Sequence, residues 1–230
     1  MSFALGLQSS DWTALGVTLK LAAVSTLLML ASATPVALWL SVTRSRFKPW
    51  VASLVSLPIV LPPTVLGFYL LLALGPQGVL GALLANLDLP GLAFTFPGLV
   101  LGSVIYSFPF VVQPIQSAIE AVGERPREVA ATLRAGTLDL WWNVVFPMAR
   151  PGFIRAAILG FAHTVGEFGV VLMIGGNREG ETRVASVQLY EYVEGMQFEE
   201  AHRLALVLIA FSFFCLLALS YITPAGQERR

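Results

Sequence analysis

Long runs of apolar residues, separated by short polar segments, dominate this sequence. Residues 21–42, 51–74, 90–119 and 204–222 carry no charged side chain, and residues 156–175 carry only His163 and Glu167 as ionisable groups. A helix needs about 20 mostly apolar residues to cross the hydrocarbon core of a bilayer. The pattern therefore predicts five transmembrane helices, at about 14–42, 51–74, 96–118, 152–175 and 204–222.

The first apolar run also has some features of a signal peptide. Lys20 precedes an apolar stretch that reaches the small residues Ala31, Ser32 and Ala33, which mimic a cleavage site. However, no basic region opens the chain, and the run continues past the small residues to Val42. We therefore interpret it as an uncleaved first helix.

The composition agrees with a membrane protein and excludes several other classes. Of the 230 residues, 56% are apolar and 12% are charged, whereas soluble domains have about 25% charged residues. The net charge is zero, which argues against a nucleic-acid partner. One cysteine and two histidines provide neither a disulfide nor a metal-ligand cluster. We expect an all-α integral membrane protein with one domain, residues 1–230, and no metal site.

Positive charges are distributed unequally between the two sides of such a five-helix arrangement. One side would carry Arg44, Arg46, Lys48, Arg125, Arg127, Arg134, Arg150, Arg155, Arg229 and Arg230. The opposite side would carry Arg178, Arg183 and Arg203. Short cytoplasmic loops are enriched in arginine and lysine. This predicts an N-terminus outside the cell and a cytoplasmic C-terminus.

The outer segment 178–203 is rich in glutamate, but its middle part, residues 184–193, mixes apolar and polar positions. Two interpretations remain open for this part. It lies along the membrane interface or re-enters the membrane, or it is an ordinary solvated loop.

The cytoplasmic segment 120–151 is long for a connection between two membrane helices. Pro126 suits the first turn of a helix, and Glu128 is favourable near its positive end. Val129 and Leu133 would lie on one apolar stripe, and Gly136 is predicted to end the helix, with a second turn stopping near residues 146–147. Such a helix either docks in a groove of another protein or rests on the membrane.

Residues 128–136 (EVAATLRAG) and 144–147 (VVFP) resemble the EAA loop of ABC-importer permeases. Glu128, Ala130 and Pro147 keep the register of that motif, whereas Val129 replaces its second alanine and Arg134 stands where glycine is usual. The resemblance implies that this loop couples the permease to an ATPase subunit. The residues expected to do so are Glu128, Val129, Ala130, Ala131, Arg134, Ala135, Gly136 and Pro147.

Two further stretches resemble molybdate permeases in particular. These are residues 57–69 (LPIVLPPTVLGFY), and residues 161–169 (FAHTVGEFG) with the stretch 176–182 (GNREGET) after them. Sulfate permeases share the Gly-Glu-Phe-Gly block, so a sulfate or thiosulfate permease remains the alternative. The resemblance implies the type I ABC-importer fold of methionine and maltose permeases, in the inner membrane of a bacterium or archaeon.

The same resemblance implies a function and a set of partners. Two copies of the chain would form a homodimer that imports molybdate or tungstate by alternating access. Two ABC ATPase subunits and an extracytoplasmic molybdate-binding protein would complete the machine. The sequence contains no Gly-x-x-x-x-Gly-Lys-Ser/Thr phosphate loop. We therefore expect that this chain is not an enzyme and binds no cofactor, and that ATP and Mg²⁺ bind to the partner.

A dianion can cross the membrane only along a protein-lined path. Prolines in the second apolar run break backbone hydrogen bonds, which indicates either a bent helix beside this path or a simple kink. The expected lining of the path or gate is Pro62, Pro63, Thr64, Thr164, Gly166, Glu167 and Gly169. None of the apolar runs themselves contains an arginine.

His163 and Glu167 are four residues apart and therefore face the same side of the fourth helix. A carboxylate repels molybdate, so we interpret Glu167 as a structural hydrogen-bond acceptor, with a gating role as the alternative. Gly166 and Gly169 allow either close approach of another helix or a hinge.

Two other classes fit the sequence less well. An ion-coupled secondary transporter would have more spans and inverted repeats. An intramembrane hydrolase would need a nucleophile with a nearby base, and no triad spacing accompanies His163 and Glu167.

Overall fold

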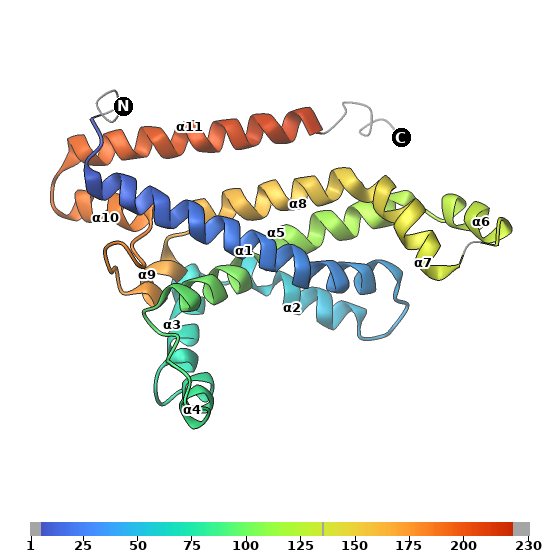
Figure 1. Cartoon of the computed structure of the whole chain (residues 1–230), viewed down its shortest axis with the longest axis horizontal. Helices are drawn as coiled ribbons and strands as arrows, with labels where there is room; N and C mark the ends of the chain where they lie inside the picture. Colours follow the sequence, from blue (N-terminus) through green and yellow to red (C-terminus); the bar gives the residue numbers. More distant parts are fainter. Residues whose placement is uncertain (1–5, 135, 223–230) are drawn as a thin grey trace.

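The computed structural model describes residues 6–134 and 136–222, and every regular element in these ranges is helical (Figure 1). In chain order they are α1 (Ser9–Val42), α2 (Lys48–Val60), α3 (Pro63–Leu74), α4 (Val79–Asn86), α5 (Phe96–Val122), α6 (Arg125–Thr132), α7 (Thr137–Leu140), the π-helical turn η1 (Trp141–Val145), α8 (Phe146–Gly166), α9 (Gly169–Gly175), α10 (Ala185–Glu194) and α11 (Phe198–Ile222).

Five helical stretches within the described residues are long and apolar enough to cross a membrane, which agrees with the predicted number. They are Ser9–Val42, Pro63–Asn86, Phe96–Val122, Thr137–Gly166 and Phe198–Ile222. The first, third and fifth differ from the predicted bounds by a few residues at one end, whereas the second and fourth differ more, because an interruption divides the predicted helix.

The predicted second span, 51–74, is two helices. α2 ends at Val60 and α3 begins at Pro63. Pro62 and Pro63 lack a backbone N–H, and a proline also disfavours helical geometry in the residue before it. Leu61 and Pro62 are accordingly extended, with ψ of 136° and 132°. The prolines therefore separate the two helices rather than kink a single one.

The predicted fourth span, 152–175, is also divided. α7, η1 and α8 form one helical stretch from Thr137 to Gly166, so the helix begins well before the expected start. Glu167 then becomes extended, with φ −63° and ψ 137°, and α9 begins at Gly169. The interruption lies at Glu167 and Phe168, where the sequence contains no proline.

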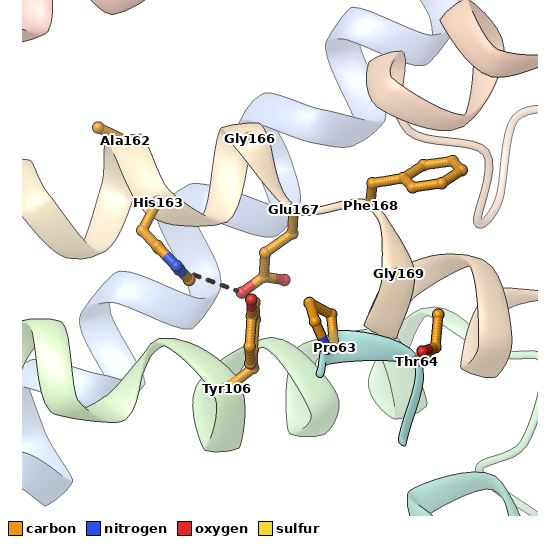
Figure 2. A pocket seen from close by; sticks show the side chains of 9 residues that line it. All are labelled: Pro63, Thr64, Tyr106, Ala162, His163, Gly166, Glu167, Phe168 and Gly169. Atoms are coloured by element: carbon orange, nitrogen blue, oxygen red, sulfur yellow. Dashed lines mark ion pairs between the residues drawn. The ribbon is translucent and has the colours of Figure 1, made fainter. Parts of the chain in front are cut away.

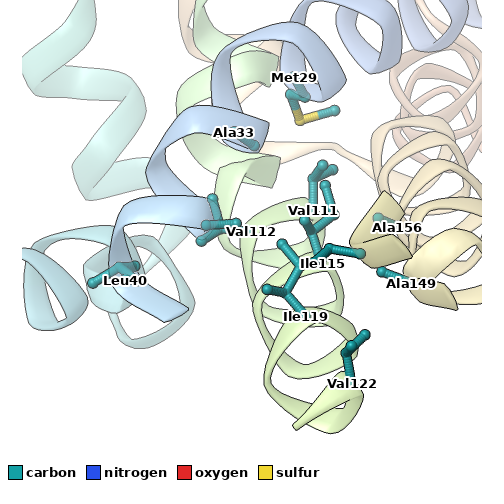
Figure 3. Close-up of a cluster of buried hydrophobic side chains, with 12 residues drawn as sticks. Met29, Ala33, Leu40, Val111, Val112, Ile115, Ile119, Val122, Ala149 and Ala156 are labelled. Carbon is teal, nitrogen blue, oxygen red and sulfur yellow. The ribbon is translucent and has the colours of Figure 1, made fainter. Parts of the chain in front are cut away.

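α5 is the central helix and packs against both α1 and α8. Their shared core combines branched side chains of α5 with small residues of its neighbours (Figure 3). A Cβ atom added at Gly152 of α8 would lie 2.1 Å from the Cβ of Ala118, and one at Gly160 would lie 2.7 Å from Val111. Because lipid tails are as apolar as leucine, membrane helices associate through such close packing. Small residues on α8 therefore bring it against α5.

The segment 184–193, for which the sequence left two interpretations open, is mostly the helix α10. Its Val187, Gln188 and Tyr192 are buried, and the Tyr192 hydroxyl donates to Asp11 Oδ1 of α1 at 2.7 Å. The backbone N–H of Ala185 also donates to Thr18 Oγ1 at 2.7 Å. A packed helix replaces the solvated loop of one interpretation.

Candidate functional site

The two interrupted helices meet at a cavity of about 420 Å³, which we call the Glu167 cavity (Figure 2). The start of α3, the end of α8 and the start of α9 surround it, together with Tyr106 of α5. Its lining residues are Pro63, Thr64, Tyr106, Ala162, His163, Gly166, Glu167, Phe168 and Gly169. α9 lies directly against α3, since a Cβ atom at Gly169 would be 2.8 Å from that of Pro63.

Five of the seven residues predicted for the path or gate line this cavity: Pro63, Thr64, Gly166, Glu167 and Gly169. Pro62 caps the start of α3 next to it. Thr164 instead points into the protein, where it is buried and lies 3.3 Å from Ser107 Oγ. The structure thus brings together residues that are distant in sequence, and their role in transport stays a prediction.

The Glu167 carboxyl group is buried and has partners on α5. Ser103 Oγ donates to Glu167 Oε2 at 2.5 Å, and Ser107 Oγ donates to Glu167 Oε1. The hydroxyl of Ser186, in the first turn of α10, donates to the backbone carbonyl of Glu167. A buried carboxylate is costly unless it is hydrogen-bonded. These contacts give Glu167 hydrogen-bond partners within the chain, and its structural role stays a prediction.

His163 forms the edge of the cavity toward α5. Its Nδ1 lies 2.8 Å from Ser107 Oγ and 3.8 Å from Glu167 Oε1, the pair drawn in Figure 2. Its ring stacks on Phe110 with the centroids 3.8 Å apart, and Tyr106 lies at 5.0 Å. The sequence did not indicate these α5 residues. Their spacing, with Tyr106 and Phe110 four residues apart beside Ser103 and Ser107, is the only signal that could have found them.

A second region of interest is the coupling segment, residues 120–151. Within it α6 exposes Glu128, and Val129 and Leu133 are 59% and 77% exposed, whereas Ala130 is buried. The side chain of Ala131 and the whole of Ala135 lie outside the described residues. The exposed apolar surface here resembles one side of an incomplete interface.

Two predictions about the coupling segment are wrong in detail. Gly136 does not end the first helix: α6 ends at Thr132, and Gly136 is the residue before α7. The left-handed residue is Arg134, with φ 58°. Nor does the second helical turn end near Pro147. The π-helical turn η1 continues directly into α8, and Pro147 lies in the first turn of α8, where its missing N–H is tolerated.

The family model that describes binding-protein-dependent transport system inner membrane components matches residues 33–230. The chain belongs to this family. Its members are multi-pass proteins of the inner membrane, and they are the permease subunits of ABC importers.

The curated relatives include molybdenum permeases and sulfate permeases. The chain is 58% identical over 213 residues to the molybdenum transport system permease protein ModB of Azotobacter vinelandii, a match that covers 93% of this chain and 94% of the relative. It is 31% identical over 189 residues to the sulfate transport system permease protein CysT of Salmonella typhimurium, covering 81% of this chain and 68% of the relative.

Solved structures support the predicted fold. A chain of the MetNI methionine ABC transporter in inward-facing conformations superposes with a TM-score of 0.67 at 17% identity, covering 94% of this chain and 95% of that one. A chain of a bacterial alginate ABC transporter, in complex with an alginate-bound periplasmic protein, gives 0.75 at 16% identity, with coverages of 96% and 81%. The type I importer fold implied by the sequence is therefore confirmed.

Proposed function

We propose that this chain is the permease subunit of an ATP-driven importer of molybdate, with tungstate as a related substrate. The observation that carries the proposal is 58% identity to a molybdenum permease along nearly the whole of both chains, against 31% to a sulfate permease over a shorter match. Two copies of the chain would form the translocation path between them. A sulfate permease is the second candidate, because it shares the Gly-Glu-Phe-Gly block.

The orientation that fits this function has the N-terminus outside and α6 in the cytoplasm. Arginines near the end of the molecule that contains α6, such as Arg125, Arg134 and Arg150, support it through the positive-inside rule. The opposite end, with α10 and the short helix α9, then faces the extracytoplasmic binding protein.

The coupling segment would dock on the ATPase subunit. α6 and η1 border a cavity of about 510 Å³ whose lining includes Val129, Leu133 and Val144. Exposed apolar side chains on a short helix are a common means of docking into a groove. Two ATPase subunits, which bind ATP and Mg²⁺, would each engage one copy of α6, so that their closure moves α5 and α8.

The Glu167 cavity would lie on the path of the anion. Thr64 offers a hydroxyl there, and the interrupted helices expose backbone groups at their ends. Because the Glu167 carboxylate is negatively charged and already accepts hydrogen bonds from two serine hydroxyls, it would shape the cavity rather than bind the dianion. Weak binding along the path allows release, and the binding protein outside would supply selectivity.

Reconstitution tests this function directly. The permease would be purified with its ATPase, placed in proteoliposomes, and supplied with the binding protein and molybdate. We expect uptake that requires ATP and is inhibited by tungstate more strongly than by sulfate. Uptake of sulfate in preference to molybdate would favour the second candidate, and ATP-independent uptake driven by an ion gradient would contradict both.

A further inference from the structure

The Glu167 cavity combines a buried carboxylate with a proposed path for a dianion. Glu167 is part of its lining, and like charges repel strongly where water is scarce. The nine residues that line the cavity all belong to the described part of the chain, and they include neither lysine nor arginine. His163 is the one member of this lining whose side chain can carry a positive charge. Within one copy of the chain, a cationic partner for the anion at this point of the path therefore has to be His163.

The hydrogen bonds to α5 determine which ring nitrogen of His163 carries the proton. Ser107 has one hydroxyl proton, and it donates this proton to Glu167 Oε1. The Ser107 oxygen, 2.8 Å from His163 Nδ1, is therefore left as an acceptor, so Nδ1 must be the donor. A neutral imidazole has one proton on its nitrogens. In neutral His163 the other nitrogen, Nε2, consequently holds a lone pair and no proton.

The edge of the ring that carries Nε2 is the part of His163 left for a ligand. One face of the ring stacks on Phe110 with the centroids 3.8 Å apart, and Nδ1 is engaged by Ser107. Among residues 6–134 and 136–222, none forms a hydrogen bond with Nε2. The side chain is nevertheless 22% exposed and lines the Glu167 cavity (Figure 2). Its free nitrogen is therefore available on the side of the cavity.

We propose that protonated His163 binds the transported anion through its Nε2–H, so that the anion and a proton occupy the Glu167 cavity together. Neutral His163 presents a lone pair at Nε2, which repels an oxyanion, whereas the imidazolium presents a donor and a positive charge. In the protonated state His163 also pairs with Glu167 Oε1, 3.8 Å from Nδ1, which offsets the charge of the carboxylate. Thr64 of α3 and Tyr106 of α5 add hydroxyl groups to the same lining. This inference rests on the proposed function.

Binding of the anion and binding of the proton are then linked. The proton comes from solvent and returns to it when the anion leaves the cavity. A proton that strengthens anion binding is itself bound more tightly while the anion is present. The affinity of the cavity for the anion should therefore be highest at low pH and should fall as the pH rises and His163 loses its proton.

Few other titratable groups face His163 from the elements packed around it. Among the residues that line the cavity, all of them described, Glu167 and Tyr106 are the only others that titrate. α3 and α9 contribute no titratable residue to the lining, and α1 and α11, which also contact α8, contribute no lining residue at all. A pH dependence of anion binding that disappears on substitution of His163 would therefore report on its own proton.

Protection of a cysteine placed in the cavity measures this affinity. Thr64→Cys would be introduced in a Cys215→Ser background, which removes the single native cysteine, and the complex with the ATPase would be placed in lipid nanodiscs. Ala162→Cys, also in the lining, provides a second reporter if the first complex does not assemble. Labelling by the neutral reagent N-ethylmaleimide would be measured with increasing molybdate, and with chloride at equal ionic strength.

The measurement is repeated between about pH 6.5 and 8.5, within the range in which histidine changes its charge. Each labelling rate is divided by the rate without anion at the same pH, which cancels the effect of pH on the thiol itself. We expect molybdate, but not chloride, to protect the cysteine. Half-protection should require about fivefold more molybdate, or still more, at the upper limit of pH than at the lower limit.

Two substitutions of His163, made in the same reporter protein, separate the roles of its two nitrogens. The amide nitrogen of asparagine lies near the position of Nδ1, so His163→Asn preserves the donor to Ser107 and places nothing at Nε2. The amide nitrogen of glutamine reaches the position of Nε2, so His163→Gln supplies a neutral donor there that does not titrate. At the lower limit of pH, half-protection of the asparagine variant should require about tenfold more molybdate or more. The glutamine variant should be intermediate, and neither should respond to pH.

His202→Gln is the matched control for these variants. His202 is the only other histidine of the sequence, and it is exposed on α11. Its replacement should leave both the protection and its pH dependence unchanged. Thermal unfolding midpoints of all the variants would show whether each complex is folded.

Three results would overturn the inference: no protection by molybdate at either reporter position, a pH dependence that survives in the His163→Gln protein, or equal protection in the His163→Asn and His202→Gln proteins. ATP-dependent molybdate uptake by the unmodified complex is measured in parallel. Uptake without protection that depends on His163 rejects only the role of this histidine, whereas absence of uptake rejects the proposed function itself.

Discussion

Two regions of this molecule interrupt the regular course of the membrane helices, and they do so in opposite ways. At Glu167 the chain leaves α8 in a buried position, where Ser103 and Ser107 donate to its carboxylate and Ser186 donates to its backbone carbonyl. In the coupling segment the chain turns at Arg134, in a left-handed conformation, and Leu133 stays 77% exposed.

The difference shows which of the two regions finds its stabilising contacts within the chain itself. Around Glu167 the hydrogen-bond donors are supplied by α5 and α10 of the same chain, so the conformation belongs to the permease itself. In the coupling segment apolar side chains such as Val129 and Leu133 are exposed, and under the proposed function the ATPase subunit would cover them. Substitutions at the first region should change the stability of the permease, and substitutions at the second should change only its assembly.

The largest effect is expected from Glu167→Leu. Leucine leaves the Ser103 hydroxyl without its acceptor and removes one partner of Ser107, and an unsatisfied buried group costs about 1–3 kcal/mol. We expect a clearly lower thermal unfolding midpoint of the purified permease and loss of most molybdate uptake. Glu167→Gln retains an acceptor oxygen and should keep measurable uptake.

Ser212→Ala is a suitable control for this experiment. Ser212 is exposed on α11 and donates to the Leu208 carbonyl of its own helix at 2.8 Å. Its replacement should leave the unfolding midpoint nearly unchanged. If Glu167→Gln instead abolished uptake in a stable, fully assembled complex, the carboxyl group would have a gating role and the comparison between the two regions would fail.

An intermediate effect is expected from Glu128→Lys and Leu133→Asp in the coupling segment. Both side chains are exposed, and substitutions at exposed positions usually change the free energy of unfolding by less than about 0.5 kcal/mol. Association with the ATPase, measured by co-purification and by affinity, should nevertheless weaken by about tenfold or more, which corresponds to about 1.4 kcal/mol.

Leu87→Asp provides the matched control, because Leu87 is also exposed but follows α4, far from the coupling segment. It should leave ATPase affinity unchanged. Should Glu128→Lys and Leu133→Asp bind the ATPase as strongly as the unmodified chain, the coupling segment would not be the docking surface.

The sequence predicted the parts of this structure that depend on local chemistry. Long apolar runs gave the five spans, and Pro62 and Pro63 indicated an interruption because their missing N–H groups act within the same helix. The EAA-like residues indicated the coupling segment, and Glu167 was recognised as a buried acceptor because a carboxylate within an apolar run must have partners.

The remainder depends on contacts between distant segments. No proline marks the interruption at Glu167, which instead depends on hydroxyl groups of Ser103 and Ser107, more than fifty residues earlier. Serine within an apolar helix carries no signal of its own, since it often bonds to its own backbone. The start of the fourth helical stretch at Thr137, ahead of the predicted start at 152, likewise involves the π-helical turn before Pro147.

The smallest expected effect concerns the backbone of Arg134. A residue with a Cβ atom in the left-handed region carries a cost of about 1–2 kcal/mol, from which glycine is exempt. Arg134→Gly and Arg134→Val both remove the guanidinium group, so the difference between them isolates the conformation with φ of 58°. We expect the glycine variant to bind the ATPase within about twofold of the unmodified chain and the valine variant to bind severalfold more weakly, since β-branched residues tolerate this region worst.

Hydrogen exchange of the amides in α7 and η1 would locate the cause of this difference. Faster exchange in the valine variant alone would mean that the left-handed turn holds the coupling segment ready for its partner. Equal exchange and equal affinity in the two variants would mean that the turn is remade when the ATPase binds. In that case the ATPase would fix the conformation of the coupling segment as well as bury its apolar side chains. The conformation at Glu167, by contrast, is fixed by hydrogen bonds within the permease itself.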